Sequence, residues 1–298
     1  MVLRVLELFS GMGGMHSALD LIEIEYEIIA AIDINPTANL MYSSNFPQVP
    51  IINRSIETIS IKQWEKWHAD LWTMSPPCQP FTRQESKPKY ILLENVFGFQ
   101  DSDAHRLLLE TLQLNNYSYE QYLLSPIQFG IPNSRLRYYL IAKQQENPID
   151  THSSIIHTQI SNFERLLTKL HEQFPSKDPN QSMIINDFIL SDENAEFELD
   201  DKQLKRGLNV CDIITCYAKR SFCFTKSYGK YFEGTGSLFR TQNDHIRYFT
   251  PKEIANLHCF PSTYNFPESI TTRQAYSLLG NSLNVFVIGV LFENLFER

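Results

Sequence analysis

Short apolar runs alternate with helical patterns through the first third of the chain. Residues 3–9 (LRVLELF) and 27–33 (EIIAAID) are predicted strands, and residues 15–22 between them have the spacing of a helix. Two more apolar runs, 70–74 (DLWTM) and 90–95 (YILLEN), are expected to form strands that are buried on both faces. Strands that alternate with helices in this way are typical of a parallel sheet in an α/β fold.

The regular pattern is interrupted in the second half of the chain. The predicted elements continue with a helix over 101–114, strands over 118–125 and 136–142, a return of α/β character over 247–257 and a helical tail over 282–296. From about residue 146 to 245 the apolar periodicity is low. We therefore predict a large α/β domain formed by residues 1–145 and 246–298, with a smaller domain over residues 146–245.

Composition limits the class of protein. The hydrophobic fraction of 43% suits an ordinary folded core. The longest strongly apolar stretch, residues 285–292, is much shorter than the ~20 residues of a membrane span, and the N-terminus has no signal-peptide pattern. Five cysteines, with spacings that match no zinc motif, predict reduced thiols and no metal site. We expect a location in the cytoplasm, the nucleus or both.

Charge is unevenly distributed although the net charge is −8. Residues 185–201 contain seven acids and no base, whereas residues 202–252 contain ten Lys or Arg and three acids. The net value argues against a protein that coats nucleic acid indiscriminately, but the basic stretch could steer a polyanion to one face. The alternative is a mixed surface without a binding role.

A glycine-rich turn and an acid point to a cofactor site. The sequence FSGMGG (9–14) joins the first predicted strand to a helix, and Asp33 ends the second strand. Glycines there allow a ligand to approach the backbone, and a carboxylate at the second strand can accept hydrogen bonds from ribose hydroxyls. The spacing differs from GxGxxG, which favours S-adenosylmethionine (AdoMet) over a nicotinamide dinucleotide. The alternatives are a tight turn and a helix-capping acid.

Cys78 is a candidate nucleophile. It lies in SPPCQPF (75–81), directly after a predicted buried strand, so that the thiol would project from the carboxyl edge of the sheet. The flanking prolines stiffen this loop. A free cysteine is more often a small buried hydrophobic residue, which is the alternative here.

Three further side chains complete a possible reaction. Glu94 closes an apolar strand, where an acid is costly unless it is paired or used. Arg135 and Arg137 alternate on the incoming strand and are expected to face the same way, although an exposed basic pair is equally compatible. A thiolate that adds to carbon 6 of cytosine activates carbon 5, a Glu at ring nitrogen 3 stabilises the adduct, and an Arg holds the carbonyl at carbon 2. The base must leave its stack to enter such a site.

Five segments, in order, resemble the motifs of the cytosine-5 methyltransferase family. They are FSGMGG (9–14), PPCQPF (76–81), ENV (94–96), RLRYYLIA (135–142) and GNSLNVFVI (280–288). The resemblance covers nearly the whole chain and implies a Rossmann-like AdoMet-dependent methyltransferase sheet with helices on both faces, together with a smaller target-recognition domain. Cys-Phe-Thr at 223–225 and the tract 247–261 resemble the branch that methylates a cytosine in the anticodon loop of aspartate tRNA.

The resemblance also assigns residues. The implied catalytic residues are Cys78, Glu94, Arg135 and Arg137. The implied cofactor site, for AdoMet and its product S-adenosylhomocysteine, consists of Phe9, Ser10, Gly11, Met12, Gly13, Gly14, Asp33, Ile34, Ile56, Glu57, Ser75, Asn281 and Ser282. Cys223, Phe224 and Thr225, together with the basic residues Lys202, Lys205, Arg206, Lys219, Arg220 and Lys226, are the expected substrate-binding residues. The expected partner is tRNA, with DNA as the alternative, and the expected state is a monomer.

Two departures from the family pattern are visible. Asn133 stands where DNA enzymes often have a glutamine. The link from Cys78 to Glu94 is short for a parallel crossover, and we suspect that residues are missing between about Arg83 and Lys87. The alternatives to a tRNA enzyme are a DNA cytosine-5 methyltransferase, a nucleic-acid-binding protein without catalysis, and a nucleotide-dependent oxidoreductase.

Overall fold

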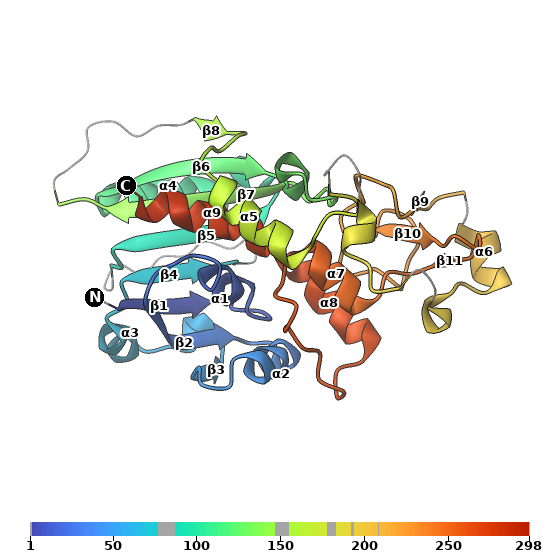
Figure 1. The fold of residues 1–298 in the computed structure, drawn as a ribbon. Coiled ribbons are helices and arrows are strands. Elements are labelled where there is room, and N and C mark those ends of the chain that lie inside the picture. The colour runs from blue at the N-terminus through green and yellow to red at the C-terminus, as the bar shows by residue number, and fades with distance from the viewer. Residues whose placement is uncertain are drawn as a thin grey trace. The chain divides into compact units, whose positions relative to one another are not determined.

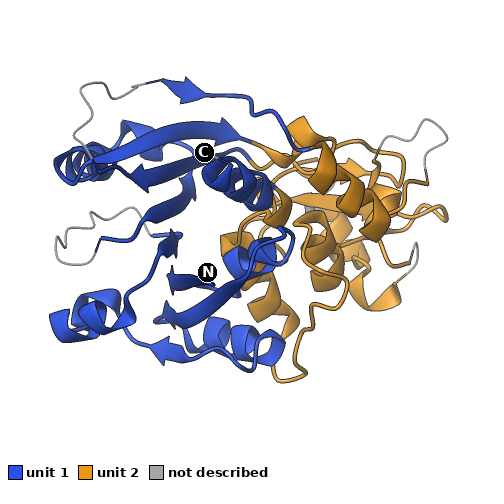
Figure 2. Cartoon of the chain, turned by 60° about the vertical axis from the view of Figure 1, so that its left-hand side comes forward, with its two compact units in different colours: residues 1–124, 136–163, 287–298 blue, residues 125–135, 164–286 orange. Residues whose placement is uncertain are grey.

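A computed structural model describes most of the chain (Figure 1). The described residues are 2–76, 87–146, 155–177, 183–191, 194–207 and 209–297. They divide into two compact units (Figure 2). Unit 1 comprises Met1–Leu124, Leu136–Phe163 and Val287–Arg298, and unit 2 comprises Ser125–Arg135 and Glu164–Phe286.

Unit 1 is built on a mixed sheet in which eight strands lie within the described residues. The strands are β1 (Leu3–Leu8), β2 (Tyr26–Asp33), β3 (Ile51–Asn53), β4 (Leu71–Met74), β5 (Tyr90–Val96), β6 (Tyr117–Leu124), β7 (Arg137–Gln144) and β8 (Ile156–His157). Their order is β3-β2-β1-β4-β5-β7-β6-β8. Only β7 pairs antiparallel with its neighbours among these strands, on β5 and on β6. The predicted parallel pairing of the strands at 70–74 and 90–95 is confirmed.

Helices cover both faces of this sheet, as the sequence predicts. They are α1 (Gly14–Leu19), α2 (Pro36–Asn45), α3 (Ile61–Trp67), α4 (Asp103–Leu114) and α9 (Val285–Phe296), whose residues from 287 onward belong to unit 1. One face packs against Trp64 of α3 and Leu112 of α4. On the other face, α1 and α9 lie in front of the strands in Figure 1, and Asn294 of α9 donates a hydrogen bond to the hydroxyl of Tyr122 at 2.7 Å.

Unit 2 combines short helices with a small sheet. Its helices are α5 (Glu164–Gln173), α6 (Asp201–Gly207), α7 (Pro251–Leu257) and α8 (Thr272–Asn281), and its strands β9 (Asp212–Ile214), β10 (Ser237–Arg240) and β11 (Ile246–Arg247) pair in the order β11-β10-β9. Residues 251–286 belong to this unit, and α8 contacts the segment that follows β11, where the Tyr276 hydroxyl donates to the Phe249 carbonyl at 2.6 Å. The functional domain boundaries predicted at residues 146 and 246 stay a prediction.

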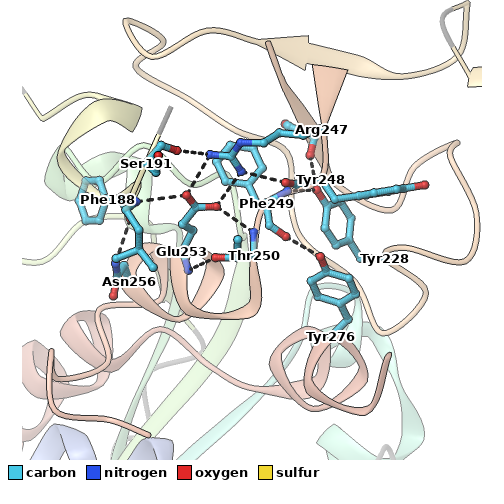
Figure 3. Close-up of polar contacts among 12 residues, drawn as sticks. Phe188, Ser191, Tyr228, Arg247, Tyr248, Phe249, Thr250, Glu253, Asn256 and Tyr276 are labelled. Carbon is cyan, nitrogen blue, oxygen red and sulfur yellow. Dashed lines mark hydrogen bonds and ion pairs between the residues drawn. The ribbon is translucent and has the colours of Figure 1, made fainter. Parts of the chain in front are cut away.

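A buried ion pair forms part of the core of unit 2 (Figure 3). The Arg247 guanidinium meets the Glu253 carboxylate through two contacts of 2.9 Å, and both side chains are almost completely buried. Glu253 also accepts the backbone N–H of Thr250 at 2.8 Å, while the Thr250 hydroxyl accepts the N–H of Glu253 at 3.2 Å. This capping box fixes the start of α7.

One described stretch, Thr272–Phe296, passes a test of length and apolar composition for a membrane span. It is interrupted at residues 282–284, between α8 and α9. In its most apolar window, 83% of the residues are buried inside the protein, as is usual for a core helix, so its composition is only weak evidence for a membrane.

Candidate active site

The glycine-rich turn after β1 has an unusual backbone. Phe9, Gly11 and Gly13 have φ angles of 54°, 54° and 85°, a region that is uncommon for residues other than glycine. A Cβ on Gly13 would lie 2.7 Å from the ring of Phe46, so this position requires glycine. The turn therefore passes closely over α2 and leads directly into α1.

Asp33 holds this turn at the end of β2. Its Oδ2 accepts the N–H of Gly11 at 2.9 Å, and its Oδ1 accepts the N–H of Asn35 at 2.8 Å. Each carboxylate oxygen can accept a further hydrogen bond, so that ribose hydroxyls remain possible partners. Asp33 thus joins the two strand ends that the sequence assigned to a cofactor.

Two neighbouring observations fit an adenosine-containing ligand. The hydroxyl of Ser10 is buried and has no hydrogen-bond partner among the described residues. Ile34, directly after Asp33, is 67% exposed, which leaves an apolar side chain that a base could cover. A buried polar atom without a partner is costly, and a ligand would satisfy it.

The other predicted cofactor residues of unit 1 follow the same sheet edge. Ile56 and Glu57 lie in a 3₁₀ turn (Ile56–Thr58) after β3, and Ser75 follows β4. Met12 is buried in the turn, and Gly14 begins α1. Because β3, β2, β1 and β4 are parallel neighbours, their carboxyl ends gather these residues at one edge. Asn281 and Ser282 lie at the end of α8 in unit 2.

A buried acid lies below the glycine-rich turn and was not singled out from the sequence. Glu7 of β1 is 0% exposed and accepts a hydrogen bond from the Tyr42 hydroxyl. Nδ1 of His16 lies 2.9 Å from the same hydroxyl. Burial raises the pKa of Glu7 to about 8 and lowers the pKa of His16 to about 4. The signal in the sequence was an acid within the otherwise apolar run LRVLELF.

Glu94 and Arg137 meet at the same edge of the sheet. Strands β5 and β7 are antiparallel, and Val96 pairs with Arg137, so the end of β5 lies beside the start of β7. Nε of Arg137 is 3.5 Å from Oε1 of Glu94, and the Glu94 side chain is 9% exposed. An acid that is buried this far is stabilised by such a cation.

The segment that leads to Cys78 begins next to this pair. Nδ2 of Asn95 donates to the carbonyl of Pro76 at 3.1 Å, and both residues are buried. Cys78 itself lies outside the described residues, two positions after Pro76. Pro76 is therefore held at the end of β5, next to the residue that follows Glu94.

Arg135 has partners of a different kind from those of Arg137. It lies two residues before β7, in unit 2, and is 2% exposed. Its guanidinium donates to the carbonyls of Phe224 at 3.2 Å and Gly280 at 3.1 Å, and also to the carbonyl of Ser282. Nη1 is 3.2 Å from the sulfur of Cys223. Arg135 therefore connects three segments that carry predicted motifs.

The Cys-Phe-Thr segment packs tightly on the end of α8. A Cβ on Gly280 would lie 2.1 Å from the backbone nitrogen of Lys226 and 2.1 Å from the carbonyl carbon of Thr225. Phe224 is 1% exposed, with its ring centroid 5.0 Å from that of Tyr228. The glycine of the last motif is thus required by close contact with the recognition motif, which the sequence did not indicate.

The predicted basic residues lie mainly on the surface of unit 2. Lys202 and Lys205 are exposed on α6, and Lys219, Arg220 and Lys226 are exposed on the segment that follows β9, whereas the side chain of Arg206 lies outside the described residues. Arg220 forms an ion pair with Asp212 at 3.2 Å. Within the part of the chain that is described, no group of three or more His, Cys, Asp or Glu could hold a metal ion.

Comparison with known proteins identifies related sequences along the whole chain. The profile of the C-5 cytosine-specific DNA methylase family matches residues 3–86 and 82–297. The tRNA (cytosine(38)-C(5))-methyltransferase of Homo sapiens is 37% identical, with 99% of each chain covered. A DNA (cytosine-5)-methyltransferase of Dictyostelium discoideum is 36% identical over 98% of this chain and 93% of its own length. The crystal structure of Spodoptera frugiperda DNMT2 superposes with a TM-score of 0.85 at 35% identity and covers 99% of both chains.

The comparisons also bear on the short link after Cys78. The alignment with the human relative extends over 388 positions, whereas this chain has 298 residues, so the relative carries segments that this chain lacks. The two parts of the family match meet at residues 82–86. These residues, where the suspected omission begins, lie outside the described part of the structure.

Proposed function

The chain belongs to the C-5 cytosine-specific DNA methylase family, and from this premise we propose that it methylates carbon 5 of a cytosine in the anticodon loop of aspartate tRNA. Methyltransferases of this family use AdoMet. The observation that supports methylation of a cytosine is the buried Glu94–Arg137 pair at the carboxyl edge of the sheet, beside the anchored Pro76.

The residues at the carboxyl ends of β1 to β4 would hold the cofactor. Asp33 would accept the ribose hydroxyls, the unpartnered hydroxyl of Ser10 would bond to the ligand, and Ile34 would cover part of the adenine. Gly11 and Gly13 keep the turn narrow enough for close approach. When it is bound there, AdoMet supplies the methyl group for carbon 5.

The protein's own residues would carry the covalent steps. The Cys78 thiolate forms a bond to carbon 6 of the cytosine, and the electron pair of the 5,6 double bond becomes available at carbon 5. Glu94 donates a hydrogen bond or a proton to ring nitrogen 3, and Arg137 holds the carbonyl at carbon 2. After carbon 5 has been methylated, a base removes its proton, the double bond is restored and the bond to sulfur breaks.

Arg135 supports this reaction indirectly. Its guanidinium donates hydrogen bonds to the carbonyls of residues 224, 280 and 282. Its proposed role is therefore to hold the Cys-Phe-Thr segment against the motif at residues 280–288. Cys223 would then belong to target recognition. The basic residues of unit 2 would attract the phosphates of the RNA.

The relatives support tRNA as the substrate, with DNA as the second candidate. Proteins from Homo sapiens and Spodoptera frugiperda are named tRNA (cytosine(38)-C(5))-methyltransferase, while the one from Dictyostelium discoideum is named a DNA methyltransferase at nearly the same identity. Methyl transfer should be measured side by side on aspartate tRNA and on duplex DNA. We expect transfer to tRNA that is lost in Cys78→Ala. A clear preference for DNA, or normal activity of the Cys78 variant, would overturn the proposal.

The remaining features of the proposal concern the state of the protein. We propose that it acts as a monomer in the cytoplasm, the nucleus or both, with residues 146–245 as the recognition domain. Light scattering during gel filtration tests the first point, and a dimer at assay concentration would contradict it.

A further inference from the structure

Exposed aromatic side chains and cations are concentrated in residues 217–231. This segment contains four Lys or Arg and no acid, in a protein whose net charge is −8. Tyr217, Phe222 and Tyr231 are 74%, 46% and 56% exposed. Three large aromatic rings are thus exposed within fifteen residues that carry a net positive charge.

Phe222 is held in its exposed position by its neighbours. Its backbone N–H donates to the Ser237 hydroxyl at 2.8 Å, and the hydroxyl of the preceding Ser221 donates to the Pro132 carbonyl at 2.8 Å. Phe224, two residues further on, is buried. The Arg220 guanidinium lies 5.0 Å from the centre of the Phe222 ring. The exposed ring is thus fixed by its backbone and accompanied by a cation.

Tyr231 lies in a loop that is closed by hydrogen bonds. The N–H of Thr225 donates to the carbonyl of Thr235 at 2.9 Å, and the Thr235 hydroxyl donates to the carbonyl of Tyr231 at 2.7 Å. Nζ of Lys230 is 4.9 Å from the centre of the Tyr231 ring. This ring therefore repeats the arrangement at Phe222: an exposed aromatic side chain on an anchored backbone, next to a cation.

We propose that Phe222 and Tyr231 stack on unpaired bases of the RNA substrate, while Arg220 and Lys230 pair with the adjoining phosphates. This inference rests on the proposed function and specifies which part of the RNA unit 2 recognises. An aromatic ring can stack only on a base that has left its own stack, so the two residues favour a loop over a continuous duplex. Phosphate pairing alone would bind both kinds of RNA.

The test compares an RNA hairpin that has an unpaired loop with a fully paired RNA of the same length. Binding is measured by fluorescence anisotropy without AdoMet, so that it does not depend on turnover. Phe222→Leu and Tyr231→Leu should each weaken hairpin binding by about fivefold or more, the usual loss for one stacked base, and should leave duplex binding unchanged. Phe222→Trp, in contrast to Phe222→Leu, should retain hairpin binding, because tryptophan keeps an aromatic face on which a base can stack.

Two controls separate stacking from charge and from folding. Arg220→Gln and Lys230→Gln should weaken the hairpin and the duplex alike and reduce the salt dependence of both. Leu114→Ala, at a side chain in unit 1 that is 77% exposed, should change neither affinity. Unchanged melting temperatures for the Leu variants are expected, because both rings are exposed.

Either of two results would overturn the inference: hairpin affinities of the Leu variants within twofold of the unsubstituted protein, or equal losses on hairpin and duplex. A protein that binds the hairpin through both rings but transfers no methyl group would contradict the proposed function and leave this inference standing. If both Leu variants transfer methyl groups to tRNA and bind the hairpin as the unsubstituted protein does, the stacking inference is contradicted and the proposed function is retained.

Discussion

Arg247 and Glu253 form a bidentate ion pair whose two side chains are 0% and 1% exposed. The guanidinium also donates to the Ser191 carbonyl at 2.7 Å, and the carboxylate accepts the N–H of Leu190 at 3.1 Å (Figure 3). The pair therefore joins β11, the start of α7 and the segment around residue 190. Charges that are buried this deeply are tolerated only while both are present.

Removal of one partner should strongly destabilise unit 2. Glu253→Ala leaves a buried guanidinium without its counter-charge, and we expect the free energy of unfolding to fall by about 3–5 kcal/mol. Urea unfolding followed by circular dichroism measures this loss. The matched control is Glu110→Ala on α4, which breaks an exposed pair with Arg106 and should cost less than about 1 kcal/mol. Equal losses in the two variants would contradict the assignment.

Gly280→Ala should be destabilising although alanine favours helices. Gly280 lies in α8, where alanine is usually about 1 kcal/mol more favourable than glycine. The new Cβ would overlap the backbone at Thr225 and Lys226, so we expect a loss of about 1–3 kcal/mol instead. The control is Arg273→Ala, at an exposed position of the same helix, which should leave the free energy of unfolding nearly unchanged. A Gly280→Ala protein that melts at a higher temperature would show that the Cys-Phe-Thr segment does not rest on this glycine.

Much of unit 1 could be predicted because its strands are continuous apolar runs with turn residues at their ends. The strands predicted at 3–9, 27–33, 70–74 and 90–95 are confirmed. The antiparallel direction of β7 was not predicted, because a buried run has the same pattern in either direction.

Contacts between distant segments explain what the sequence did not reveal. The strands β9, β10 and β11 have two to four residues each, too few for a period to be recognised. Arg135 and Arg137 are two positions apart and look equivalent in the sequence. Yet Arg135 donates to backbone carbonyls of distant segments, whereas Arg137 pairs with Glu94 and donates to the carbonyl of its neighbour Leu136. The partner of a buried polar group is set by tertiary packing, which residue spacing does not encode.

Glu7 should make stability depend on pH. Its folded pKa is raised to about 8 from the ordinary value of 4.5, so the native state keeps a proton that the unfolded chain releases between these values. Stability therefore falls as the pH rises from about 5 to 8, by at most about 1.4 kcal/mol per pH unit. His16, whose pKa is about 4, stays neutral in this window, and the Asp20 carboxyl, whose pKa is also raised, faces the same cluster.

Glu7→Gln removes this titration and keeps the shape of the side chain. Urea unfolding at several pH values between 5 and 8 should give a flatter profile for the variant, with its advantage over the unsubstituted protein greatest near pH 8. Glu110→Gln, at an exposed position, serves as the control and should follow the original profile. Parallel profiles for all three proteins would exclude Glu7 as the titrating group.

The link between Cys78 and Glu94 gives a prediction about the natural chain. Strands β4 and β5 are parallel neighbours, and such a connection usually contains a helix. We expect the protein isolated from its source to carry additional residues between about Arg83 and Lys87, and therefore to exceed 34.7 kDa. Intact mass spectrometry measures this directly, and a mass that matches the printed sequence would refute it.

Asp33 should govern cofactor affinity more than turnover. Its carboxylate holds the N–H of Gly11, so Asp33→Ala removes both the proposed ribose acceptor and the support of the turn. We expect AdoMet binding to weaken by about tenfold or more, in line with one or two charged hydrogen bonds at about 1.5–3 kcal/mol each. Calorimetry with AdoMet tests this, with NAD as the second ligand. Asp33→Asn, which keeps an acceptor oxygen for Gly11, should lose less. Two results would show that this turn does not hold AdoMet. One is an unchanged AdoMet affinity in Asp33→Ala, and the other is that the unsubstituted protein binds NAD but not AdoMet in calorimetry.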